Sequence, residues 1–247
     1  NTYSGTTTVS AGILSIAADT ALGTAPGSAS PGQLTIGTAT LATTGAFTLN
    51  ANRGIALTGT GTFSPTAALA YAGIIAGSGN LTKAGASTLT LSGLNTYSGT
   101  TTVSAGTLDV QSSSALGGTG ATTVASGAAL NVDGTGLVLA NPLTLSGTGI
   151  GATGALRNLA NGNTWSGAIT LAAAATIESD GGTLSLGAIS ATAKALTVSG
   201  SGNTSVGGVI ALTTGALAKT GTGTLTLGGV NTYSGTTTVS AGILSIA

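Results

Sequence analysis

The sequence predicts an all-β protein that folds as a parallel β-helix, a solenoid of about ten to eleven coils. Three observations predict it: short segments alternate apolar and small polar residues and end at Gly, closely similar segments recur along the 247 residues, and two-residue hairpin turns are scarce. Alternation with period two marks a strand with one buried face. Recurrence at a regular step is typical of a solenoid, in which each coil stacks on the next.

The expected strands carry Leu, Ile, Val or Phe at every second position, with small residues, chiefly Thr and Ser, between them. Thr, Val and Ile have stiff side chains that favour strands, whereas Gly supplies turns at positive φ. Such strands could also build a sandwich or a barrel. Asp-Gly pairs, which favour hairpins, occur only at residues 133–134 and 180–181, so we favour the parallel arrangement. In chain order, the clearest strands are expected at residues 34–37, 47–49, 89–93, 143–147, 184–187, 196–200 and 225–229.

One motif, Asn-Thr-Tyr-Ser-Gly followed by a Thr-rich strand, sets the step. It begins at Asn1, Asn95 and Asn231, and a degenerate version with Trp begins at Asn163. The spacings of 94, 68 and 68 residues fit a common step of about 23 residues, within the range of one solenoid coil. Residues 1–17 recur unchanged as residues 231–247. We therefore expect residues 1–247 to be a single continuous β-helix, one 230-residue unit plus a 17-residue overlap of a longer tandem array.

The composition excludes several classes of function. The chain has no His and no Cys, which removes the usual catalytic triads, zinc sites and redox motifs. Five Lys and Arg residues balance five Asp and Glu residues, so the chain lacks the net positive charge that is typical of proteins that bind nucleic acids. No apolar stretch is long enough for a membrane helix. We expect no cofactor, no metal, no nucleic-acid partner and no transmembrane segment in these residues.

Residues 87–108 resemble the autotransporter-associated β-strand repeat, also called the passenger-associated transport repeat. The resemblance rests on Leu-x-Leu, a small residue beside Gly, Asn-Thr-Tyr-Ser-Gly and a Thr-rich strand. The same module recurs from Thr222 onward, and its second half is present from Asn1. This resemblance implies a right-handed β-helix on the outside of a Gram-negative-type bacterium. It implies no catalytic residues, because the family shares none.

The repeat positions provide the first candidate site residues. Four aromatic residues occupy one position of the motif, namely Tyr3, Tyr97, Trp165 and Tyr233. We interpret them as corner residues that pack over a coil, the alternative being an aromatic row that stacks against carbohydrate. The Asn residues that open the motif are Asn1, Asn95, Asn163 and Asn231. Their side chains are expected to form turns by bonding to nearby backbone.

Glu178 and Asp180 form the only close acidic pair, and they are the candidate for chemistry. Two residues apart on a strand they share a face, as the carboxylates of a glycan-cleaving enzyme would. We interpret them instead as a solvated turn, because no Arg, His or aromatic residue accompanies them. A calcium site would need more carboxylates than this fragment supplies. The basic residues, namely Arg53, Lys83, Arg157, Lys194 and Lys219, are expected at the surface, where they favour solubility.

The leading functional hypothesis is a structural, non-enzymatic repeat segment of a bacterial cell-surface or extracellular fibre or stalk. Its coils would stack end to end as a stiff rod, and its partner would be itself, as adjacent tandem repeats or end-to-end copies. Lateral bundling and surface glycans are further partners to test. One alternative is an adhesin or glycan-binding passenger domain of an autotransporter. Another is a glycan-cleaving β-helix enzyme that uses Glu178 and Asp180.

Overall fold

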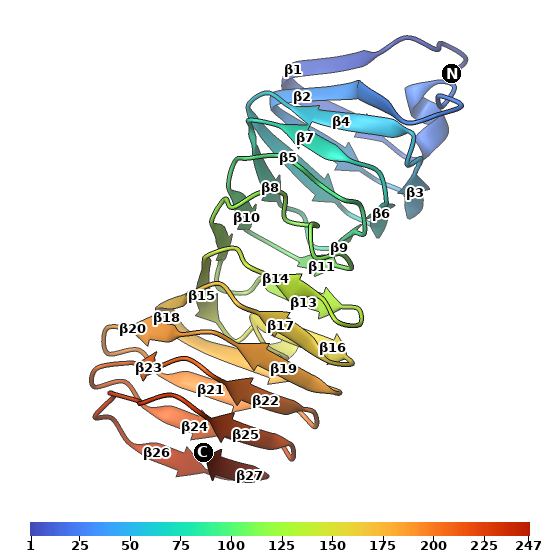
Figure 1. Ribbon diagram of the computed structural model, residues 1–247. Coiled ribbons are helices and arrows are strands. Elements are labelled where there is room, and N and C mark those ends of the chain that lie inside the picture. Colours follow the sequence, from blue (N-terminus) through green and yellow to red (C-terminus); the bar gives the residue numbers. More distant parts are fainter. The chain divides into compact units, whose positions relative to one another are not determined.

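The computed structural model describes all 247 residues and divides them into two compact units, Asn1–Ala121 and Thr122–Ala247. Both units consist of short strands, and within each unit every strand pair is parallel. In each unit, strands of successive coils lie one below the other (Figure 1). The chain makes about ten coils in total, so the predicted parallel β-helix is confirmed.

Unit 1 contains three columns of strands. The first contains the early part of β1 (Thr7–Ile16), the early part of β2 (Ser30–Thr43), β4 (Arg53–Leu57) and β7 (Ile75–Gly77). The second contains the later parts of β1 and β2, then β5 (Thr60–Pro65), β8 (Asn80–Lys83) and β10 (Thr101–Val103). The third contains β3 (Phe47–Leu49), β6 (Leu69–Tyr71), β9 (Thr88–Leu91) and β11 (Thr107–Val110). One short 3-10 helix, η1 (Asp19–Leu22), lies between β1 and β2.

Unit 2 repeats this plan with three columns of its own. The first contains β12 (Thr122–Val124), β15 (Leu143–Gly147), the early part of β18 (Ile169–Ser179), β20 (Ile189–Ala191) and β23 (Ile210–Ala211). The second contains β13 (Ala129–Asp133), β16 (Leu156–Ala160), the later part of β18, β21 (Leu196–Ser199), β24 (Leu217–Lys219) and β26 (Thr237–Val239). The third contains β14 (Val138–Leu139), β17 (Asn163–Trp165), β19 (Thr183–Leu186), β22 (Asn203–Val206), β25 (Thr224–Leu227) and β27 (Ile243–Ile246). The 3-10 helix η2 (Ile150–Ala152) lies between β15 and β16.

The core of each unit is a stack of aliphatic side chains at alternate strand positions. In unit 1, Leu69, Leu89 and Leu108 follow one another in the third column, and all are buried. The backbone hydrogen bonds between these parallel strands set the spacing of successive coils at about 4.8 Å. Glycine makes the same close approach possible at a corner, because a Cβ on Gly79 or Gly99 would collide with a carbonyl of the preceding coil.

The coils are unequal, so the predicted common step of about 23 residues is wrong. Thr107 lies opposite Thr88, 19 residues earlier, whereas Leu34 lies opposite Thr7, 27 residues earlier. The long steps occur where a corner contains extra residues, including η1 in unit 1 and η2 in unit 2. The core fixes the lengths of the inward-facing strands, while the surface corners accommodate insertions.

Candidate functional site: contacts of the repeat motif between coils

The Asn that opens the motif joins a coil to the coils before and after it. The Oδ1 atom of buried Asn95 accepts a hydrogen bond from the Ile75 N–H at 2.8 Å, and its Nδ2 donates to the Ala115 carbonyl at 2.7 Å. These partners lie 20 residues before and 20 residues after Asn95. One side-chain amide thus pairs with two backbone groups, one on each neighbouring coil. Either backbone group would cost about 1–3 kcal/mol if it were left buried and unpaired. We call this arrangement the Asn clamp.

The other two full copies of the motif each make one half of the Asn clamp. Nδ2 of Asn1 donates to the Ala21 carbonyl, 20 residues later, at 2.7 Å. Oδ1 of Asn231 accepts from the Ile210 N–H, 21 residues earlier, at 2.8 Å. The expectation that these Asn side chains bond to nearby backbone in a turn is therefore wrong for the full copies, because their partners lie 20 or 21 residues away on other coils. In the degenerate copy, Oδ1 of Asn163 also accepts from an earlier coil, at Leu137 N–H (2.9 Å).

The tyrosine of the motif contacts the first part of the strand that follows it. The Tyr97 hydroxyl lies 2.6 Å from Thr101 Oγ1, and burial of the ring raises the pKa of Tyr97 to about 12, although the hydrogen bond from Thr101 opposes this shift. The same Tyr–Thr contact recurs in the other copies, where Tyr3 lies 2.8 Å from Thr7 and Tyr233 lies 2.8 Å from Thr237. All three full copies of the motif therefore share this Tyr–Thr contact.

The four aromatic residues differ in their exposure: Tyr97 and Trp165 are buried, whereas Tyr3 is 41% exposed. In unit 1, Tyr97 and Tyr3 make equivalent backbone contacts, because their carbonyls accept from the N–H groups of Gly118 and Thr24, at 2.8 Å in each case. In unit 2, Trp165 belongs to β17 of the third column and its Nε1 donates to the Asn141 carbonyl at 3.0 Å. Tyr97 and Trp165 are completely buried and offer no ring face to a sugar. The burial of Tyr97 and Trp165 counts against the aromatic-row alternative at these two positions.

Lys83 and Lys219 are buried, so the prediction that they lie at the surface is wrong. Nζ of Lys83 donates to the carbonyls of Ala84 (2.8 Å), Gly85 (2.9 Å) and Ala105 (2.9 Å), and Ala105 belongs to the next coil. Lys219 donates to Gly221 in the equivalent turn. Burial lowers the pKa of Lys83 to about 8 and also lowers the pKa of Lys219. Each ammonium group replaces its water shell with backbone carbonyls at the corner of a coil.

These contacts coincide with segments that belong to a known repeat. The passenger-associated-transport-repeat family matches residues 1–16, 81–110 and 217–246. The chain carries passenger-associated transport repeats. The matched segments contain all three full copies of the motif and both buried lysines, but not the degenerate copy at residues 163–171. A search of curated proteins found no match, and a search of solved structures found none either.

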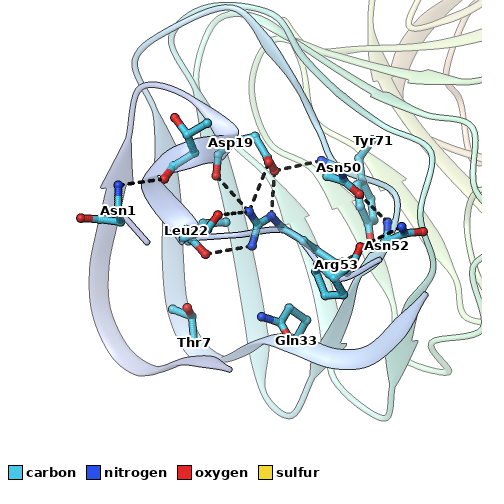
Figure 2. A network of polar contacts seen from close by, with 12 residues as sticks. Asn1, Thr7, Asp19, Leu22, Gln33, Asn50, Asn52, Arg53 and Tyr71 are labelled. Carbon is cyan, nitrogen blue, oxygen red and sulfur yellow. Dashed lines mark hydrogen bonds and ion pairs between the residues drawn. The ribbon is translucent and has the colours of Figure 1, made fainter. Parts of the chain in front are cut away.

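Outside the passenger-associated transport repeats, Arg53 forms the centre of a polar network in the first coils of unit 1 (Figure 2). Its Nε donates to Asp19 Oδ1 at 2.8 Å, and its Nη atoms donate to the carbonyls of Leu22 (2.8 Å) and Gly23 (2.6 Å). The Tyr71 hydroxyl donates to the Arg53 carbonyl at 2.6 Å. Arg53 is buried, so its predicted place at the surface is also wrong, and the charge is compensated by η1.

The acidic pair also lies outside the passenger-associated transport repeats, and an arginine accompanies it. Arg157 lies opposite Glu178 in the neighbouring coil, and its Nε donates to Asp180 Oδ2 at 2.8 Å. Ser199 donates to Glu178 Oε2 at 2.9 Å. Desolvation raises the pKa of Glu178, helped by nearby Asp180 and opposed by Ser199. The expectation that no Arg accompanies the pair is wrong, because coil stacking joins residues that are more than 20 positions apart.

The arrangement of the acidic pair is that of a link between coils. Each carboxylate has a partner from an adjacent coil, Arg157 for Asp180 and Ser199 for Glu178. No group of three or more His, Cys, Asp or Glu side chains in the 247 residues could hold a metal ion. Separately, the structure contains no helix of the length and apolarity that a membrane span requires.

Proposed function

We propose that the chain is a structural repeat segment of a bacterial cell-surface or extracellular fibre or stalk, in which successive units join coil to coil. The passenger-associated transport repeats support a secreted or surface location in a Gram-negative-type bacterium. One observation supports the structural role: the motif can pair with the preceding coil along one edge and with the following coil along the other. Because each added coil then gains an interface with the one before, stability grows with the length of the array.

The two edges of the motif can be followed in its three full copies. We call the identical residues 1–17 and 231–247 the overlap segment. At residues 1–17 its strand pairs with the following coil, with Thr7 opposite Leu34. At residues 231–247 it pairs with the preceding coil, with Thr237 opposite Leu217. The copy that begins at Asn95 pairs with both neighbours, so one overlap segment could join two 230-residue units in the same way.

The coil that follows the motif supports this junction. Ala-Leu-Gly occurs at residues 21–23, after the first copy, and at residues 115–117, after the copy at Asn95. The clamp amides of Asn1 and Asn95 donate to the Ala carbonyl of this tripeptide in both cases. A unit that followed residues 231–247 with the sequence found after residue 17 would offer Asn231 the same acceptor.

Binding or cleavage of glycans has less support. Tyr97 and Trp165 are buried, and the carboxylates of Glu178 and Asp180 are engaged with neighbouring coils. A glycan array would test the adhesin alternative, and binding that is lost in Tyr3→Ala, where the ring is partly exposed, would favour it. We propose that the chain has no enzymatic activity.

The structural proposal is tested by a spliced fusion in which residues 1–247 continue directly into a second copy of residues 18–247. Electron microscopy is expected to show particles of doubled axial length, and limited proteolysis is expected to leave the joint as resistant as the segment at Asn95. In the matched control, residues 1–230 continue into residues 18–247, so the overlap segment is missing and the joint should be cleaved. Separate bodies joined by a protease-sensitive link in the spliced fusion would overturn the proposal.

A further inference from the structure

The first column of unit 2 borders a hollow of about 340 Å³ that opens to solvent. The hollow lies between β18 and the turn after β20, which belong to successive coils. Hydroxyl residues and one basic residue line it together with a few apolar residues, namely Thr170, Leu171, Ser190, Ala191, Thr192 and Lys194. We call this hollow the Lys194 groove. It contains none of the aromatic residues of the motif and neither member of the acidic pair.

Lys194 is the one basic residue of the chain whose charge has no partner. Arg53 and Arg157 form ion pairs with aspartates, and Lys83 and Lys219 donate to backbone carbonyls. Lys194 is exposed, and its side chain makes no hydrogen bond and no ion pair. An unpaired ammonium group beside a hollow attracts an anionic ligand, because a charge-assisted hydrogen bond is stronger than a neutral one.

The hydroxyl groups of the Lys194 groove belong to a longer row. Ser190 lies opposite Thr170 in a parallel pair, and their Oγ atoms are 3.4 Å apart. Thr170 in turn lies opposite Thr144, and Thr144 lies opposite Thr123, so the row continues along the first column at the strand spacing of about 4.8 Å. A hydroxyl group both donates and accepts hydrogen bonds. The row therefore matches an elongated ligand that carries many hydroxyl groups of its own.

The turn that carries Lys194 is held by the coil that follows it. Ala193 has a φ of +55°, and Thr213 of the next coil has a φ of +53°, a conformation that is costly for residues other than Gly. The Ala193 N–H donates to Thr213 Oγ1 at 2.9 Å. Contacts between the two coils thus fix the backbone beside Lys194 without a ligand, so binding does not have to order this turn.

We propose that the Lys194 groove binds an acidic polysaccharide, with Lys194 paired to the carboxylate of one sugar residue. A carboxylate carries a single negative charge, which one ammonium group balances. The sugar hydroxyls bond to Thr170, Ser190 and Thr192, whose hydroxyl groups supply both donors and acceptors. A nucleic acid fits less well, because its closely spaced phosphates call for several cations and the groove has one. This inference goes beyond the proposed structural role and does not depend on it.

Titration of the full chain with an oligogalacturonate, followed by NMR, tests the Lys194 groove. The oligogalacturonate is expected to shift the amide signals of residues 190–194. A galactose oligomer of the same length has no carboxylate and should bind at least about tenfold more weakly, because the charge-assisted hydrogen bond is missing. Lys194→Met should cause the same loss with the oligogalacturonate, and Lys194→Arg should retain most of the binding. Thr192→Val, which removes one hydroxyl group, should weaken binding about threefold.

The matched control is Arg157→Gln, which removes the same charge from unit 2 at a residue outside the Lys194 groove and should leave the binding unchanged. Equal losses in Lys194→Met and Arg157→Gln would show that only net charge matters, and would overturn the site. Acetate that binds at residues 190–194 as tightly as the oligogalacturonate would overturn the sugar, because the carboxylate alone would then account for binding. A chain that binds no oligogalacturonate would overturn the inference as a whole, while the spliced fusion would still test the proposed function separately.

Discussion

Asn95 forms hydrogen bonds to two other coils, which its sequence neighbours do not indicate. It is buried and satisfies two backbone groups on different coils. Asn95→Ala is expected to lower the free energy of unfolding by about 3 kcal/mol, because both groups lose their partner inside the protein. Asn1→Ala, at the same motif position but exposed, should cost less than about 1 kcal/mol. Urea unfolding midpoints compare the two variants, and equal losses would contradict the Asn clamp.

Lys83 makes the free energy of unfolding depend on pH in the alkaline range. Burial lowers its pKa from 10.5 to about 8, so between these values the unfolded chain binds a proton that the folded chain has released, and stability rises with pH. Tyr97 acts in the opposite direction, because its folded pKa of about 12 exceeds the ordinary 10.0, and its contribution is lost above pH 10. Stability should therefore be greatest near pH ~10.

The matched variants for this pH dependence are Lys83→Met and Lys194→Met. Lys83→Met should flatten the rise in the unfolding midpoint between pH 8 and pH 10 without abolishing it, because the pKa of Lys219 is also lowered. Lys194 is exposed, so Lys194→Met should leave the rise unchanged. A midpoint that falls steadily from pH 8 upward in the unsubstituted chain would show that the carbonyls around Nζ hold the proton on Lys83.

At the scale of the strand and its turn, the motif has a glycine at the same position in each copy. Comparing Gly→Ala at two of these copies distinguishes the cost of a strained backbone from the cost of a clash with the neighbouring coil. Gly106 and Gly12 both have left-handed backbone, with φ of +67° and +80°. A Cβ on Gly106 would collide with the Gly85 carbonyl and lie 2.6 Å from Lys83 Nζ, whereas a Cβ on Gly12 meets nothing within 4 Å. Gly12→Ala should cost about 1 kcal/mol from the backbone alone. Gly106→Ala should cost about 3 kcal/mol or more.

Thermal or urea unfolding of the two glycine variants provides the measurement. Gly106→Ala should also release Lys83 from its carbonyls, and this returns the pKa of the lysine toward its ordinary value and weakens the alkaline rise in stability. Similar destabilisation in both variants would show that the turn, and not the neighbouring coil, limits this position.

The elements that can be predicted best from the sequence are the strands in which apolar and polar residues alternate over a few neighbouring positions. The alternating segment at residues 47–49 coincides with β3, and the segment at residues 89–93 overlaps β9. The same alternation contained an unused signal for the buried lysine, since Lys83 follows Leu81 at the next inward position of β8. The pairing of Arg157 with Asp180 could not be predicted, because unequal corner insertions hide which residues of successive coils become neighbours.

At the scale of the whole molecule, three copies of one sequence report on the coils around them. Residues 1–12, 95–106 and 231–242 are identical, so their amides have the same intrinsic exchange chemistry and differ only in their neighbours. Ser104 and Ser240 donate their N–H groups to Lys83 and Lys219 of the preceding coils, at 2.9 and 2.8 Å. Ser10 occupies the same motif position in a segment that pairs with the following coil.

Hydrogen exchange followed by NMR is therefore expected to find the amide of Ser10 exchanging much faster than those of Ser104 and Ser240, because protection requires the preceding coil. In the spliced fusion, the copy at the joint should show protection on both of its edges, as the copy at Asn95 does. Since the residues are identical, no difference in propensity could produce such a pattern. Equal protection of all three serines would mean that the motif is stable by itself, and the stacking of coils would then no longer account for the stability of the array.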